Sequence, residues 1–125
     1  MKTKDIPSIV HHYLHCALWT EELESFGLEK IHANSVTQAL TDCNNFVEKA
    51  GSLLDSLTEE QIGHDFWLTR NGHGSGFLDR YLDYEDLKER ENIKKIGKKL
   101  AIICNEFNEL NVFAPDFSEH SIIIE

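Results

Sequence analysis

The segment from residue 62 to residue 80, IGHDFWLTRNGHGSGFLDR, gathers the side chains of this sequence that are best suited to chemistry. Glycine stands at every second position from 72 to 76, and alternating glycines let successive backbone N–H groups converge on an anion. His73 could serve as a general base, and Arg70 or Arg80 could clamp an anion through charge-assisted hydrogen bonds. The pattern therefore predicts a site for a phosphate or carboxylate group at this turn, with the candidate residues Asp65, Arg70, Asn71, His73, Ser75, Asp79 and Arg80.

A structural interpretation of the same segment stays open. Asn-Gly is a common turn dipeptide, and the aspartates at 65 and 79 could pair with the two arginines to hold the loop. No Gly-Lys-Ser/Thr follows the glycines and no apolar strand precedes them, so neither a Walker loop nor a dinucleotide fingerprint is present. Ser75 has no base beside it other than His73, and no catalytic residue can be assigned. We therefore expect a binding protein, with a ligand-binding protein or hydrolase centred on the turn as the alternative.

Length and charge narrow the class of protein. A chain of 125 residues predicts one domain, and a hydrophobic share of 41% is ordinary for a globular protein. The 22 acidic residues outnumber the 12 basic ones, which gives a formal net charge of −10. Binding to phosphates requires clusters of Lys and Arg, so we expect no direct binding to nucleic acid. The acidic excess suits a soluble protein, or one that presents an acidic surface to a basic partner.

Cysteines and histidines give no pattern typical of a metal or a cofactor. The three cysteines are far apart and form no Cys-x-x-Cys, so we expect buried, reduced thiols rather than a disulfide. His11 and His15 form an i, i+4 pair, but Glu22, the acid at a similar angle, lies about 10.5 Å beyond His15 along a helix axis. The sequence shows neither a secretory signal nor an apolar run of about 18 residues, which predicts a cytoplasmic location and no membrane contact.

Hydrophobic spacing predicts a mostly helical α+β domain with three long helices and one short one. The first helix is expected to begin at Ile6 and Pro7 and to run to about residue 24. The second follows a cap at Asn34 or Ser35 and continues through Leu57. A capping box at residues 58–61 predicts a short helix from residue 59 to about 71, with a strand over residues 65–70 as the alternative. Apolar residues at 3-4 spacing predict the last long helix over residues 92–110.

A small β element is expected near the C-terminus. Residues 112–113 and 122–124 have the composition of short strands, and residues 115–120 would connect them as a hairpin. An isolated hairpin is marginally stable, so we expect it to pack on the last helix and to pair with a third short strand at residues 76–79. Residues 25–34 read as a loop.

The central block also resembles a known group of proteins. Residues 63–74, with Gly76-Phe77 and Asp79-Arg80, resemble a GHDFWLTRNGHGxGFxDR block of small uncharacterised phage- and plasmid-type proteins. Those relatives often carry an aromatic residue where this chain has Leu78, and a glycine turn between the last two strands, which is missing here. The resemblance implies an accessory protein of a phage or mobile element that acts in the bacterial cytoplasm by binding a host protein, and inhibition of that protein is one way in which such binding could act. It carries no catalytic residue over to this chain.

Overall fold

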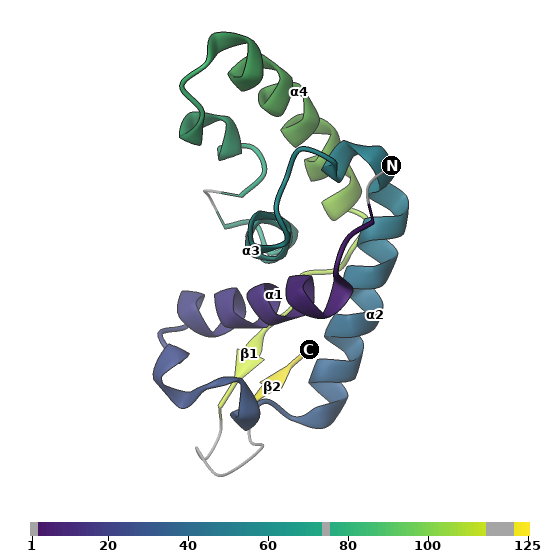
Figure 1. The fold of residues 1–125 in the computed structure, drawn as a ribbon. Coiled ribbons are helices and arrows are strands. Elements are labelled where there is room, and N and C mark those ends of the chain that lie inside the picture. Colours follow the sequence, from purple (N-terminus) through teal and green to yellow (C-terminus); the bar gives the residue numbers. More distant parts are fainter. Residues whose placement is uncertain (1–2, 74–75, 115–121) are drawn as a thin grey trace.

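The computed structural model describes residues 3–73, 76–114 and 122–125, and in them the expected mostly helical α+β fold is confirmed (Figure 1). Three long helices are present: α1 (Ile6–Thr20), α2 (Ala33–Ala50) and α4 (Leu87–Cys104). The short helix is α3 (Glu59–Arg70), and β1 (Val112–Phe113) and β2 (Ile123–Ile124) form a two-stranded sheet. Short 3-10 turns at Glu24–Phe26, Leu28–Lys30, Gly51–Leu54 and Arg80–Asp83 connect these elements. No helix in the described residues is long and apolar enough to span a membrane.

Helix α1 begins as predicted but ends earlier than residue 24. The Ser8 N–H donates to the Asp5 carboxylate at 3.2 Å, which caps the first turn. At the other end the Leu23 N–H donates to the Leu18 carbonyl at 2.8 Å, and Glu22 has a φ of 59°. This is the Schellman arrangement, which stops a helix and turns the chain back. The half-buried Leu23 packs on the core once the chain has turned, which accounts for the early end.

Helix α2 starts and ends at positions other than those predicted. Its cap is His32, whose Nδ1 accepts a hydrogen bond from the Asn34 N–H at 3.1 Å, rather than Asn34 or Ser35. Histidine is an uncommon cap, so the sequence pattern favoured its neighbours. The helix stops at Ala50 because Gly51 takes a φ of 53°, and residues up to Leu54 continue as a 3-10 turn.

The capping box of α3 is confirmed, and it decides for helix over strand. The Gln61 N–H donates to the Thr58 hydroxyl at 3.1 Å, and the Thr58 N–H donates to the Gln61 side-chain oxygen at 3.0 Å. Two donors that the first helical turn leaves without partners are satisfied in this way.

Helix α4 is shifted toward the N-terminus relative to the prediction. Asp86 caps it by accepting from the Glu89 N–H at 2.9 Å, so the helix begins at Leu87, ahead of the predicted start at residue 92. It ends at Cys104 rather than at residue 110. Phe107 and Leu110 still pack on the core, but the Leu110 N–H donates to the Asn71 side chain at 2.6 Å instead of continuing the helix.

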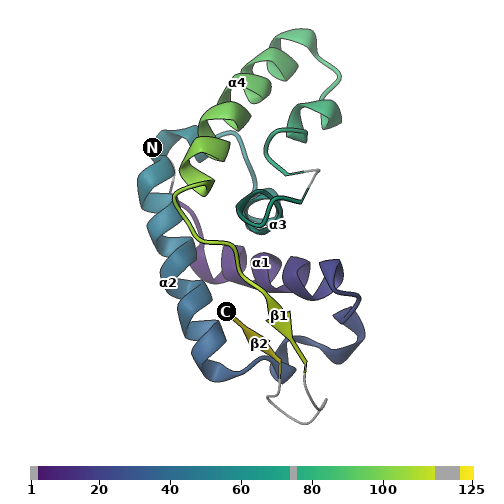
Figure 2. The same cartoon turned by 180° about the vertical axis from the view of Figure 1, so that it is seen from behind.

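The β element lies beside α1 and the start of α2, not on α4 as predicted (Figures 1 and 2). Val112 pairs with Ile124 in the antiparallel sheet, and Ile122 forms a parallel bridge with Ile31. The Ile124 N–H donates to the Ser35 hydroxyl at 2.9 Å, which fastens β2 to α2. Residues 76–79 form no strand. Their backbone closes tight turns, with the Asp79 N–H donating to the Gly76 carbonyl at 3.1 Å.

The core forms where α3 crosses α1, and Figure 1 shows α3 nearly end-on between α1 and α4. The Phe46 and Phe66 rings stack with their centroids 4.3 Å apart. Gly63 permits the close crossing, because a Cβ there would meet the Ile9 carbonyl oxygen at 2.5 Å. The largest fully buried side chains are Trp67, Tyr13, Phe46, Phe66 and Phe77.

Candidate functional site

Arg70 points into the protein rather than toward the glycine turn. Its guanidinium donates to the Asp42 carboxylate at 2.6 Å, to the Tyr13 hydroxyl at 3.1 Å and to the Asn108 carbonyl at 2.7 Å. The exposed fractions of the Arg70 and Asp42 side chains are 5% and 11%. Arg70 therefore ties α3 to α1, α2 and the segment after α4.

Asp65 and Arg80 also pair with each other. The Arg80 guanidinium donates to both oxygens of the Asp65 carboxylate, at 2.8 and 2.6 Å, and to Asp83 at 2.6 Å. Asp65 is fully buried. Burial raises the pKa of Asp65, and the hydrogen bonds from Arg80 oppose that shift. The same hydrogen bonds raise the pKa of Arg80, so both arginines of the block are occupied by internal carboxylates.

The other conspicuous residues of the block also have structural contacts. The Asn71 side chain donates to the Trp67 carbonyl at 3.0 Å and accepts from the Leu110 N–H at 2.6 Å. Gly76 is buried, and a Cβ there would collide with the Thr69 hydroxyl, which in turn accepts from the Phe77 N–H at 3.0 Å. Glycine at this position is explained by close packing rather than by ligand approach.

Two of the predicted site residues do lie together at the turn. His73 is exposed, and it lines a shallow hollow of about 390 Å³ together with Asp79. Neither Arg70 nor Arg80 lines this hollow, so the anion clamp that the sequence suggested does not form around it. Ser75 lies outside the described residues. Among the described residues, Thr69, Gly72, Gly76, Leu78, Ala101 and Asn105 also line the hollow.

The histidines of α1 lie near His64 on α3. The ring centroids of His15 and His64 are 6.3 Å apart, and those of His12 and His64 are 6.2 Å apart. Burial lowers the pKa of His64, and Glu60 opposes that shift. Within the described ranges, no group of three or more His, Cys, Asp or Glu side chains is placed to hold a metal ion.

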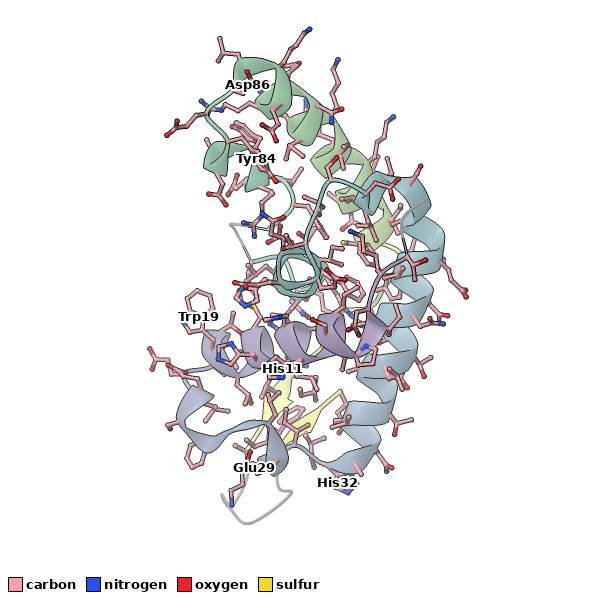
Figure 3. All side chains as sticks on the ribbon, viewed as in Figure 1. His11, Trp19, Glu29, His32, Tyr84 and Asp86 are labelled. Atoms are coloured by element: carbon pink, nitrogen blue, oxygen red, sulfur yellow. The ribbon has the colours of Figure 1, made fainter. Side chains whose placement is uncertain are left out.

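A surface that we did not predict lies at the end of α1. We call it the acidic corner and define it as Trp19, Glu21, Glu22 and Glu24. Trp19 has an exposed fraction of 54%, and Figure 3 shows it projecting outward from α1. The three glutamates are exposed, and among the residues the structure describes none forms an ion pair with them. The run WTEELE was the sequence signal for this corner, but the early end of α1 shows that the three glutamates lie in an exposed turn after the helix and not within it.

Comparison of the chain with known proteins found no matching family model, no matching curated protein and no matching solved structure.

Proposed function

We propose that the protein is an accessory protein that binds a basic surface of another protein through the acidic corner. The observation that carries this proposal is a half-exposed Trp19 next to three glutamates without ion-pair partners among the described residues. Tryptophan is enriched among the residues that dominate binding energy at protein interfaces. Its ring face attracts Lys and Arg, and the glutamates attract the same cations from a longer range.

The local structure of the corner is unfavourable for stability, which supports a role in binding. Glu22 adopts a φ of 59°, in the left-handed region that a residue with a Cβ enters at a cost of about 1–2 kcal/mol. Glu21 and Glu22 also place negative charge at the C-terminal end of α1, where the helix dipole is already negative. Strained backbone and like charges concentrated at one exposed point are typical of functional surfaces.

The proposed partner of the acidic corner is a protein of a bacterial host. The resemblance of the central block to small phage- and plasmid-type proteins supports a mobile-element protein that acts in the bacterial cytoplasm. The partner would then be a host protein, and inhibition would follow if the corner covers a basic surface that the host protein needs for its own substrate. A basic surface of this kind is common on proteins that handle nucleic acid.

The alternative, a small-ligand binding protein or hydrolase at residues 71–76, is supported only by the hollow beside His73 and Asp79. Both arginines that would hold an anion are bound to carboxylates elsewhere. We therefore rank this function second.

The test is a quantitative pull-down from bacterial lysate, followed by affinity measurement with the purified partner. Trp19→Ala should weaken binding by about 30-fold or more, since interface residues of this kind contribute at least about 2 kcal/mol. The triple variant Glu21→Gln/Glu22→Gln/Glu24→Gln should weaken binding most at low salt. Its matched control neutralises three exposed glutamates elsewhere, namely Glu48, Glu85 and Glu91.

Equal loss of binding in the triple variant and in its control would contradict the proposal, because only net charge would then matter. Full binding by Trp19→Ala and by the triple variant would also contradict it. If His73→Ala abolished binding of the partner while Trp19→Ala did not, the hollow at the turn would replace the acidic corner as the site.

A further inference from the structure

Positive charge is concentrated on one helix of this acidic chain. Helix α4 contains six of the 12 basic residues and two of the 22 acidic ones, so it carries a formal charge of +4 and the rest of the chain carries −14. The six basic residues are Lys88, Arg90, Lys94, Lys95, Lys98 and Lys99.

Four of these lysines lie on the outer side of α4, and we call them the lysine face: Lys88, Lys95, Lys98 and Lys99. Successive residues of a helix are about 100° apart, and the buried positions Ile93, Gly97, Leu100 and Cys104 define its inner side. Lys95 and Lys99 stand opposite that inner side, one turn or about 6 Å apart along the axis. All four lysines are exposed.

Carboxylates do not neutralise the lysine face. Among the described residues none forms an ion pair with any of its four lysines. Glu91 has the spacing for an i, i+4 pair with Lys95, yet no such pair forms. Of the flanking bases, Lys94 lies over the Tyr81 ring at 5.2 Å and Arg90 lies over the same ring at 5.6 Å. The lysine face is therefore a patch of uncompensated charge rather than one side of an ion-pair network.

We propose that the lysine face binds the phosphate backbone of nucleic acid without reading its sequence. Phosphates need only well-placed positive charges, whereas sequence reading needs side chains directed at base edges. Lysine is depleted in protein–protein interfaces, where an apolar, aromatic centre is usual. The outer side of α4 has no aromatic residue, and its apolar residues, Leu87 and Ile102, lie at its two ends. A polyanion fits this surface better than an acidic protein does.

The net charge of the whole chain led us to expect no binding to nucleic acid. Repulsion between acidic side chains and phosphates acts only over short distances, however. Charges separated by more than about 8 Å are largely screened at physiological salt. The acidic corner lies at and just beyond the C-terminal end of α1, which lies apart from α4 in both views of the fold (Figures 1 and 2). The two acids within α4, Glu89 and Glu91, lie in its first half, so the charged residues of its second half are all lysines. This inference uses a surface separate from the one in the proposed function, so either can fail alone.

The experiment measures fluorescence anisotropy of a labelled 30-base-pair DNA duplex, with the full chain, at 50 and 200 mM salt. Contact with three or four phosphates predicts a slope of log K against log salt of about −2.7 to −3.6, which is an affinity loss of about 40- to 150-fold over this range. The variant Lys95→Gln/Lys99→Gln should bind at least about tenfold more weakly at 50 mM salt and show a slope reduced by about 1.8.

The matched control is Lys4→Gln/Lys30→Gln, which changes the net charge by the same amount at residues outside α4 that form no ion pair among the described residues, and it should bind within about twofold of the wild type. Several outcomes would overturn the proposal. They are no binding by the wild type at 50 mM salt, an equal loss in the control, or polyglutamate binding at the same lysines as tightly as DNA. The last result would assign the lysine face to an acidic protein.

Discussion

Removing the Arg70 side chain should destabilise the protein severely, because its charge is buried against a single carboxylate. In Arg70→Ala, the one side-chain hydrogen bond that Asp42 keeps from the described part of the chain is that from the Gln38 amide at 2.8 Å. Its side chain is 11% exposed, so water reaches it poorly. The Tyr13 hydroxyl and the Asn108 carbonyl lose their guanidinium donor in the same step.

The expected size of the effect follows from this geometry. Breaking a buried ion pair by removing one partner costs about 3–5 kcal/mol, because an uncompensated charge stays inside. The Arg70 guanidinium also lies 5.4 Å from the centre of the Phe107 ring, and that contact is lost as well. We therefore expect Arg70→Ala to lower the free energy of unfolding by about 3–5 kcal/mol, a large share of the stability of an ordinary domain.

Urea unfolding followed by circular dichroism measures this loss. Lys49→Ala is the matched control, because it breaks the Lys49–Glu106 ion pair, whose side chains are 49% and 53% exposed, and should cost at most about 1 kcal/mol. The double variant Arg70→Met/Asp42→Leu should recover part of the loss, since no buried charge is left unpaired. A loss below about 1 kcal/mol in Arg70→Ala would refute the reasoning and return Arg70 to the candidates for ligand binding.

Three further predictions concern other parts of the structure. Burial lowers the pKa of His64 below its ordinary 6.5, so the stability that its neutral form contributes is fully present above 6.5 and is lost as the pH falls through the lowered pKa. Urea unfolding between pH 7 and 5 should therefore show a smaller loss of stability in His64→Gln than in the wild type, and an equal loss in both would contradict this. Gly63→Ala should lower stability by about 1–3 kcal/mol in thermal unfolding, because the new Cβ meets backbone atoms of α1. Alanine favours helix more than glycine does, so a more stable variant would show that α1 and α3 can separate freely. Burial raises the pKa of the Cys16 and Cys104 thiols to about 12 and also raises that of Cys43, so alkylation of the folded protein at pH 8 should be slow. Alkylation after unfolding without reductant should modify all three cysteines, and two missing additions in the mass would indicate a disulfide.

Local patterns predicted the elements whose determinants are local. The capping box around Thr58 and Gln61 placed the start of α3 correctly, because both partners of its hydrogen bonds lie within four residues. Hydrophobic spacing placed Leu100 in the core of α4, where it is fully buried. The same method extended α4 too far, because Phe107 and Leu110 keep a helical spacing although tertiary contacts hold them in a different conformation.

The partners of the two arginines in the central block and the position of the β element depend on contacts between residues far apart in the sequence. The spacing of residues along the chain could not reveal those contacts. The carboxylate that binds Arg70 is Asp42, which lies 28 positions earlier on another helix, and the sequence offered Asp65 and Asp79 as nearer partners. Asp65 did pair with an arginine, but with Arg80. The β element was assigned to the wrong neighbour for the same reason, since Ser35 on α2 holds Ile124 across 89 positions.

The distribution of ion pairs separates residues that hold the fold from residues that can face a partner. In the central block both arginines are paired with carboxylates, so their removal should lower stability and weaken any function only indirectly. At the acidic corner and on the lysine face the charges are exposed and lack ion-pair partners among the described residues, so their neutralisation should not lower stability. At the acidic corner it should raise stability slightly, because Glu21 and Glu22 oppose the dipole of α1. A side chain that can be removed without loss of stability, and whose loss still abolishes binding, is thus expected at the acidic corner or on the lysine face rather than among Asp65, Arg70 and Arg80. The density of ionisable groups in the sequence pointed to the block, because sequence density does not distinguish charges that neutralise one another from charges that remain available.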